Sequence, residues 1–321
     1  MPSRPRFCRT HHVAALALIA ALAGSSAPVR GEPEAKAVSA PAQKPAGSKG
    51  NVKKAGKKKV EPKPLDGSTL DYAYDARDIG RPERAWLGRA FVHTRAAASP
   101  GAPLPLIVFI HGLNTDRIKY RWMGGGNEGD VRRIVADLIE AGQIPPAIVA
   151  APSSIIPAAI ANAVTSWPSF DLDRFVDLTA ERLAGVATID RSRIIVAGHS
   201  GAGCNPTGGL PAALKGKTRP LAALSIDTCM MPSVATELAR AHPSTHVIVS
   251  WQTLSWARRP FGEFKATFLR EVEKAPPSAG VLRELEAARP TDPMPHDAMV
   301  ALTFRTWLPK LLGNPSAPAP K

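Results

Sequence analysis

Long hydrophobic runs are missing from this chain of 321 residues. The apolar run from Val13 to Leu22 is far shorter than the roughly 20 residues that a membrane-spanning helix needs, and no other stretch approaches that length. The sequence therefore excludes a transmembrane segment. Three arginines precede the run and the small-x-small pattern Ala21-Leu22-Ala23 follows it. Residues 1–23 are accordingly predicted to be a signal peptide, and the protein to be exported to the periplasm or secreted.

Cysteine is scarce as well, with three in the whole chain. Removal of residues 1–23 leaves only Cys204 and Cys229. An exported protein with two cysteines favours a disulfide between them. One follows Ser200 by four residues and the other follows a predicted strand over 221–226, so both lie at one sheet edge if their strands are neighbours. Two free buried thiols are the alternative.

Acidic and aromatic residues are rare before residue 67. Residues 1–66 hold 13 Lys and Arg against 4 Asp and Glu, so they carry +9 of the formal +14 and residues 67–321 keep +5. Residues 24–66, rich in Lys, Pro and Ala, are predicted to be a disordered linker. This linker either tethers the protein to an anionic envelope surface or serves as a spacer. A nucleic-acid partner is disfavoured because no aromatics interleave the basic run.

Metal and phosphate motifs are also missing. The histidines lack the spacing of metal ligands, and the glycine run over 124–126 follows no predicted strand. The sequence therefore predicts neither a metal nor a cofactor.

What the chain does contain is a series of short apolar runs between amphipathic stretches. Such continuous apolarity is typical of parallel strands covered on both faces. The predicted strands are 104–110, 147–151, 193–197, 221–226 and 246–250, with an antiparallel strand over 90–93, and the predicted helices are 130–141, 171–183, 261–273 and 296–312. Residues 67–321 thus read as one α/β domain, a mostly parallel central sheet with helices on both faces.

The run Ile-Ile-Val-Ala-Gly-His-Ser-Gly-Ala-Gly at 194–203 is typical of a nucleophile elbow. A strand ends at Gly198, Ser200 follows on a tight turn, and small residues suited to opening a helix come next. Ala202 stands where the last glycine of the pattern is usual, and it is small enough for strand and helix to pack. Ser200 is the candidate nucleophile.

Backbone N–H groups and a histidine complete the expected chemistry. Gly201 follows the nucleophile, and Leu113 follows His-Gly in the segment Phe-Ile-His-Gly-Leu-Asn at 109–114, so these two are the candidate oxyanion-hole donors. His296, in Pro-His-Asp-Ala-Met at 295–299, is the candidate base. His242 and His246 precede a predicted strand and so lie at the opposite edge of the sheet.

The third expected residue, a carboxylate that orients the base, is less directly indicated. The strand over 246–250 runs into Trp251 without a carboxylate, whereas Asp227 ends the strand over 221–226 and could hold the imidazole tautomer. Glu263 and Asp292 are the alternatives, and a capping role is the structural alternative for Asp227.

Aromatic residues populate the loops that would line a cleft. Trp122, Trp167 and Trp251 are the candidate substrate-binding side chains. Ordinary loop packing is the competing interpretation.

Two longer stretches carry a family likeness. They are Leu-Pro-Leu-Ile-Val-Phe-Ile-His-Gly at 104–112 and Arg-Ile-Val-Ala-Asp-Leu-Ile-Glu-Ala-Gly-Gln-Ile-Pro-Pro-Ala-Ile-Val-Ala-Ala-Pro at 133–152. With the elbow, the chain over about 85–315 resembles the α/β-hydrolase fold and, within it, the esterase D and feruloyl esterase-like group. This resemblance implies a carboxylic ester hydrolase with Ser200 as nucleophile, His296 as base, and Leu113 and Gly201 forming the oxyanion hole. Together with the predicted signal peptide, it leads us to expect an exported serine hydrolase that acts through an acyl-enzyme. An acyltransferase, as among the related mycolyltransferases, and a non-catalytic envelope-binding protein on the same scaffold are the alternatives.

Overall fold

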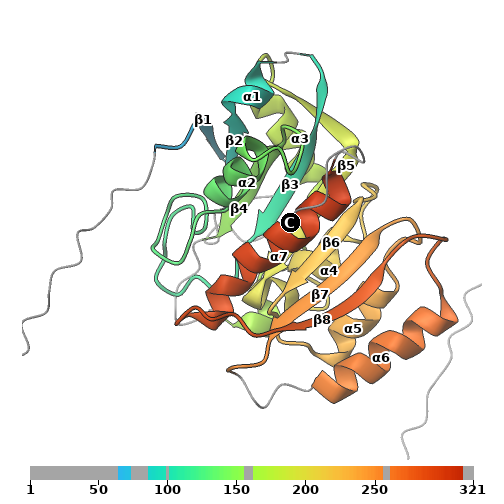
Figure 1. Ribbon diagram of the computed structural model, residues 1–321. Coiled ribbons are helices and arrows are strands. Elements are labelled where there is room, and N and C mark those ends of the chain that lie inside the picture. Colours follow the sequence, from blue (N-terminus) through green and yellow to red (C-terminus); the bar gives the residue numbers. More distant parts are fainter. Residues whose placement is uncertain (1–63, 74–85, 99–100, 155–161, 256–260, 314–321) are drawn as a thin grey trace, which may run out of the picture. The chain divides into compact units, whose positions relative to one another are not determined.

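The computed structural model describes residues 64–73, 86–98, 101–154, 162–255 and 261–313 (Figure 1). The predicted signal peptide and all but the last residues of the predicted linker lie outside this part of the chain, so both stay predictions. Among the described helices, none combines the length and the apolarity that crossing a membrane requires.

Eight strands form one sheet in the described part of the chain, in the order β1-β2-β4-β3-β5-β6-β7-β8. From β3 onward the neighbouring strands are parallel, while β1 and β2 are antiparallel to their neighbours. Their bounds are β1 Gly67–Ala73, β2 Trp86–His93, β3 Pro103–Ile110, β4 Ile148–Ser154, β5 Thr188–His199, β6 Ala222–Ile226, β7 His246–Gln252 and β8 Arg283–Ala288. The six predicted strands are confirmed, and the mostly parallel α/β class with them.

The structure adds two edge strands that the sequence did not predict, β1 and β8. Both alternate exposed and partly buried residues and contain charged side chains, as in Arg-Glu-Leu-Glu-Ala-Ala of β8. An edge strand keeps one side in contact with solvent, so it lacks the continuous apolarity of the central strands.

Seven α-helices accompany the sheet in the described residues (Figure 1). They are α1 Thr94–Ala97, α2 Val131–Glu140, α3 Leu172–Arg182, α4 Gly209–Ala213, α5 Pro232–Ala239, α6 Phe261–Lys274 and α7 Pro295–Leu312. The four predicted helices are confirmed as α2, α3, α6 and α7. The short helices α1, α4 and α5 were not predicted, since helices of eight residues or fewer give little periodicity.

The sheet separates two hydrophobic clusters, one on each face. Alternate residues of β3 enter opposite clusters, Leu106 and Val108 on one side and Ile107 and Phe109 on the other. Helices α3 to α6 pack on the first face, and α2 with α7 on the second. The buried parts of the central strands are mostly apolar because both of their faces are covered.

The chain after β5 departs from the expected helix. A 3₁₀ turn, η4 (Ser200–Gly203), follows the strand, and the next helix is the five-residue α4. Pro206 and the pair Gly208-Gly209 lie in this stretch. Proline and glycine disfavour helix interiors, which explains why the small residues after Ser200 do not open a long helix.

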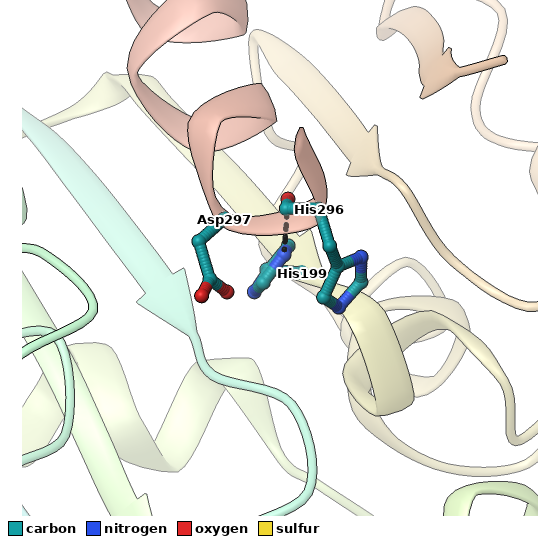
Figure 2. A group of neighbouring side chains, drawn as sticks. All are labelled: His199, His296 and Asp297. Carbon is teal, nitrogen blue, oxygen red and sulfur yellow. Dashed lines mark hydrogen bonds between the residues drawn. The ribbon is translucent and has the colours of Figure 1, made fainter. Parts of the chain in front are cut away.

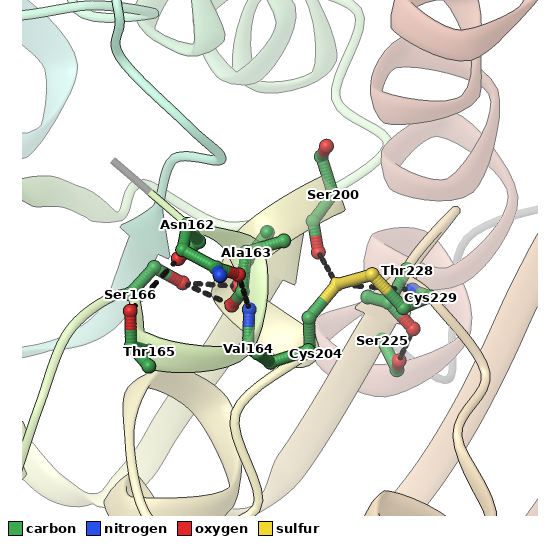
Figure 3. Close-up of a disulfide and its surroundings, with 11 residues drawn as sticks. Asn162, Ala163, Val164, Thr165, Ser166, Ser200, Cys204, Ser225, Thr228 and Cys229 are labelled. Carbon is green, nitrogen blue, oxygen red and sulfur yellow. Dashed lines mark hydrogen bonds between the residues drawn. A yellow bond between two sulfur atoms is a disulfide. The ribbon is translucent and has the colours of Figure 1, made fainter. Parts of the chain in front are cut away.

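Cys204 and Cys229 form the predicted disulfide (Figure 3). The bond joins the segment after β5 to the segment after β6, and these strands are neighbours as the prediction required. The carbonyl oxygen of Ser200 lies 3.3 Å from Cys204 Sγ, and Figure 3 shows the serine side chain on the opposite side. A disulfide sulfur carries no hydrogen, so this is a packing contact. The backbone N–H of Cys229 donates to the same sulfur at 3.2 Å.

Replacing both cysteines, Cys204→Ala with Cys229→Ala, is expected to lower the free energy of unfolding by about 3 kcal/mol. The bond closes a loop with a sequence separation of 25 residues, and cross-links of this length restrict the unfolded chain by about that amount. Urea unfolding of oxidised wild type and variant measures the difference. Alkylation of both cysteines in native, unreduced wild type would contradict the bond itself.

Candidate active site

Ser200 lies at the carboxyl end of β5, on a turn that only small neighbours permit. Its φ is +55°, a left-handed conformation that is unfavourable for a residue with a side chain. A Cβ placed on Gly198 would lie 2.8 Å from Leu210 Cβ, and one on Gly203 would lie 2.4 Å from a methyl carbon of Thr228. Ser200 itself is partly exposed, whereas Ala202 is buried. The turn therefore accepts alanine at 202 and leaves the serine within reach of solvent.

His296 and Asp227 form a hydrogen-bonded pair beside this turn. His296 Nδ1 lies 2.6 Å from Asp227 Oδ2. The carboxylate is fully buried, with 0% of Asp227 exposed, and its Oδ1 accepts the backbone N–H of Gln252 at 3.1 Å. A carboxylate can only accept, so the neutral imidazole carries its proton on Nδ1 and not on Nε2.

The structure does not bring the two alternative carboxylates into this pair. Glu263 is exposed in the first turn of α6. Asp292 is exposed too, and its Oδ1 accepts the backbone N–H of Met294 at 2.8 Å. Of the three candidates, Asp227 alone has a hydrogen bond to His296 in this structure.

The segment after β3 packs directly against the serine turn. A Cβ on Gly112 would lie 2.6 Å from Ser200 Cβ and 3.2 Å from Gly201 N, so only glycine fits there. A Cβ on Gly201 would lie 3.1 Å from Leu113 N. The backbone nitrogens of Leu113 and Gly201, predicted as oxyanion-hole donors, thus belong to two segments in close contact.

His111 and Trp167 hold that segment in place. His111 Nε2 accepts the backbone N–H of Ser154 at 3.1 Å, which leaves Nδ1 to donate to the Gly112 carbonyl at 2.7 Å. Trp167 Nε1 donates to the His111 carbonyl at 2.8 Å, and the two rings meet edge to face at 4.8 Å. Burial lowers the pKa of His111 to about 4, so the imidazole is neutral near pH 7.

The three tryptophans predicted to bind substrate are buried. Trp167 is 1% exposed, Trp122 2% and Trp251 8%. Trp122 contacts Phe109 at 5.8 Å between ring centroids, and Trp251 contacts Phe261 at 4.4 Å. These rings pack the loops against the core, as the packing interpretation expects, and their substrate-binding role stays a prediction.

A cavity of about 960 Å³ lies beside α7, the helix that carries His296. Its lining comes from the segment between β3 and α2, from α2, from the residues before α7 and from the first turns of α7 itself, and includes Glu128, Asp130, Asp292 and Asp297. Glu128 pairs with Arg121 and Asp130 with Arg132. Of the predicted site residues, Trp122 and the alternative acid Asp292 line it.

Sequence reasoning missed His199, the residue before Ser200. Its ring is 2% exposed and stacks on the ring of His296, with centroids 4.4 Å apart. His199 Nε2 lies 3.2 Å from the backbone carbonyl oxygen of His296 (Figure 2). This stack brings the imidazole of His296 next to the serine turn. The signal available in the sequence was the position of His199 at the end of a strand, directly before Ser200.

Two groups in the described residues have the composition of a metal site. His199, His296 and Asp297 form one, and Asp66, His93 and Glu140 form the other. In the second, His93 Nδ1 accepts the backbone N–H of Arg95 at 3.1 Å, so neutral His93 carries its proton on Nε2, the nitrogen that faces Glu140. That tautomer cannot coordinate a cation through Nε2. In the first group, the Nε2 of His199 is engaged with the His296 carbonyl.

Comparison with known proteins gives a likeness in structure only. No family model matches the sequence, and no curated protein matches it. Solved structures do match. One titled "ferulic acid esterase" has a TM-score of 0.54 at 13% identity, over 77% of this chain and 98% of its own. A mutant feruloyl esterase module from Clostridium thermocellum, complexed with sinapinate, has a TM-score of 0.52 at 12% identity, over 81% of this chain and 93% of its own.

The chain has the α/β-hydrolase fold. This confirms the fold that the resemblance implied. In this fold, the three segments singled out in the sequence all follow carboxyl ends of neighbouring parallel strands or begin the helix packed over them. Loops at that edge are where α/β sheets bind ligands.

The free energy of unfolding is expected to fall as the pH drops from 6.5 toward 4, with His111 as one cause. In that window the unfolded state protonates this histidine, whose pKa there is near 6.5, and the folded state does not. The contribution of neutral His111 to the free energy of unfolding is complete above pH 6.5. It decreases as the pH falls and is lost once the pH has passed the pKa of about 4 that His111 has in the folded state. His111→Asn should reduce the slope by up to about 1.4 kcal/mol per pH unit.

Urea unfolding at several pH values measures this slope. The matched control is His242→Asn, because His242 is exposed at the other edge of the sheet. If the free energy of unfolding had the same slope against pH in wild type and in His111→Asn, the pKa of His111 would not differ between the folded and unfolded states.

Proposed function

We propose that this protein is an exported serine hydrolase that cleaves carboxylic esters through an acyl-enzyme, with Ser200 as nucleophile, His296 as base and Asp227 as acid. The observation that carries the proposal is the 2.6 Å hydrogen bond between His296 and the buried Asp227, beside the strained turn of Ser200. A strained, partly exposed serine next to an imidazole oriented by a carboxylate is the arrangement that nucleophilic catalysis requires.

In the first step, Ser200 Oγ attacks the ester carbonyl carbon while His296 Nε2 takes its proton. Asp227 keeps the other proton on Nδ1, so Nε2 is available as the base, and the carboxylate stabilises the imidazolium that forms. The imidazolium then gives its proton to the departing alcohol oxygen. Water, deprotonated by the same imidazole, releases the acid and restores Ser200.

The negative charge on the carbonyl oxygen would be held by the backbone N–H groups of Leu113 and Gly201. Their segments are in close contact at Gly112, where a side chain would strike Ser200. Fixed N–H donors need no rearrangement when charge develops, and removing one such donor in a well-studied protease costs on the order of 10² to 10³ in kcat.

The substrate class follows from chemistry and from the structural likenesses. An acyl-enzyme on serine suits esters of small molecules or esters linked to polysaccharides, and the matching structures are named as feruloyl esterases. The disulfide between Cys204 and Cys229 supports export, since such bonds persist in oxidising compartments. The Lys-rich linker over residues 24–66 remains a proposed contact to an anionic envelope surface.

Ser200→Ala is expected to abolish hydrolysis of p-nitrophenyl esters and labelling by a fluorophosphonate, with an unchanged midpoint of thermal unfolding. The alanine removes the atom that forms the acyl bond and nothing that supports the fold. The matched control is Ser244→Ala, because Ser244 also hydrogen-bonds a histidine, His242 at 2.7 Å, but is exposed at the opposite edge of the sheet. Equal turnover by wild type and Ser200→Ala would refute the proposed nucleophile. Added alcohols in the assay reveal any acyl transfer.

Asp227→Asn is expected to lower kcat by about 10⁴, because an amide in place of the carboxylate favours the wrong tautomer of the base. Glu263→Gln and Asp292→Asn serve as matched controls that change an exposed carboxylate in the same way. Steady-state kinetics of the three variants identify the acid. A large loss of kcat in Glu263→Gln or Asp292→Asn, together with an active Asp227→Asn, would assign the acid to that other residue.

A further inference from the structure

The residue before the proposed nucleophile makes two contacts to the proposed base. The ring of His199 stacks on that of His296 with centroids 4.4 Å apart and an interplanar angle of 33°. His199 Nε2 also lies 3.2 Å from the backbone carbonyl oxygen of His296 (Figure 2). One side chain at the end of β5 therefore touches both the imidazole and the backbone of His296, in the first turn of α7.

The tautomer of His199 follows from this second contact. A carbonyl oxygen can only accept, so Nε2 must carry the hydrogen and donate it. The side chain is 2% exposed, and burial followed by the charge of a protonated His296 lowers the pKa of His199 to about 3. A neutral ring with a hydrogen on Nε2 is thus the form present throughout the range in which esterases are assayed.

We propose that His199 is a positioning residue that holds the base: its Nε2–H fixes the first turn of α7 through the carbonyl of His296, and its ring limits the rotation of the His296 imidazole. This inference rests on the proposed function, because it assigns His199 to the reaction through His296. It places two histidines in one reaction site with separate tasks.

The hydrogen bond acts where α7 has little other support. The helix begins at Pro295 and its N-cap, Met294, has no side-chain cap bond. Proline supplies no N–H, and the first N–H groups of any helix have no intrahelical acceptor, so contacts from outside the helix hold this end of α7. The donor from the sheet to the carbonyl of His296 is such a contact, and it fixes the helix start relative to β5 and with it the direction of the imidazole.

Ring contacts support the side chain of His199. Trp122 meets His199 edge to face, with ring centroids 5.5 Å apart and an interplanar angle of 72°. His199 in turn contacts the ring of His296, which is hydrogen-bonded to Asp227 at 2.6 Å. These contacts give the buried Trp122 a role as a support of His199.

The neutrality of His199 suits the reaction. When His296 accepts the proton of Ser200, a second positive charge 4.4 Å away would oppose it. The charged or titratable groups around His199 are His296, Asp297, Asp227 and Arg121. A buried neutral ring lets the imidazolium form beside it without repulsion.

The test compares three substitutions with a matched control. His199→Phe keeps a ring for the stack and loses the donor, His199→Asn offers a donor without the ring, and His199→Ala removes both. His242→Phe is the control, since His242 is an exposed histidine at the opposite edge of the sheet. Thermal unfolding of each variant separates folding from catalysis, because kinetics are measured well below its midpoint.

His199→Ala is expected to lower kcat about tenfold, which corresponds to about 1.4 kcal/mol of lost transition-state stabilisation. KM should change less than about twofold, because His199 is placed against the base and not against substrate. The Phe and Asn variants should each retain part of the rate. A well-folded His199→Ala with wild-type kcat, or equal losses in kcat and affinity, would overturn the proposal.

Nitrogen NMR of ring-labelled protein gives a readout that needs no variant. His199 should report a neutral imidazole with its hydrogen on Nε2 from pH 5 to 8. A protonated ring, or a hydrogen on Nδ1, would overturn the proposal even if every variant failed to fold. Fluorophosphonate labelling of wild type separates the two hypotheses. Without labelling the proposed function fails, whereas labelling with the wrong His199 tautomer rejects only the positioning role.

Discussion

The site depends on one backbone constraint, the parallel register between β5 and β6. His199 pairs with Ile226, so the next residues along the two strands, Ser200 and Asp227, leave the sheet side by side. Both have a positive φ, +55° and +47°. Slipping the register by one residue would move either side chain to the other face of the sheet. The disulfide after these two residues joins the same pair of segments and opposes such a slip.

The left-handed conformations explain why small residues surround the serine. Strain at a single residue persists only where the neighbouring packing leaves no alternative. Here the close approach of Gly112 to Ser200 and of Gly198 to Leu210 supplies that packing. The glycines thus serve two purposes, since they permit the turn and also let the segment after β3 come within reach of the serine.

The sequence predicted those parts of the molecule whose signal is local. Central strands are recognisable by their continuous apolarity, and the turn at Ser200 by its small residues. The sheet and the candidate nucleophile could therefore both be predicted. The prediction of Asp227 required only that the strand after the nucleophile strand be its neighbour in the sheet. The edge strands β1 and β8 could not be found, because half-exposed strands carry charges and resemble loops. The sequence did not decide how the tryptophans pack, because a loop position does not show that Trp167 turns inward to donate to the carbonyl of His111.

Three imidazoles near one serine owe their different properties to their hydrogen-bond partners. His111 accepts a backbone N–H at Nε2, so its hydrogen lies on Nδ1 and binds the Gly112 carbonyl. His199 faces a carbonyl with Nε2 and therefore has the opposite tautomer. Of the three, only His296 has a hydrogen bond to a carboxylate in this structure, and a carboxylate stabilises a positive charge more than a carbonyl does. Buried neutral histidines hold the backbone on both sides of the serine, and the one paired with a buried charge is the one suited to carry a proton.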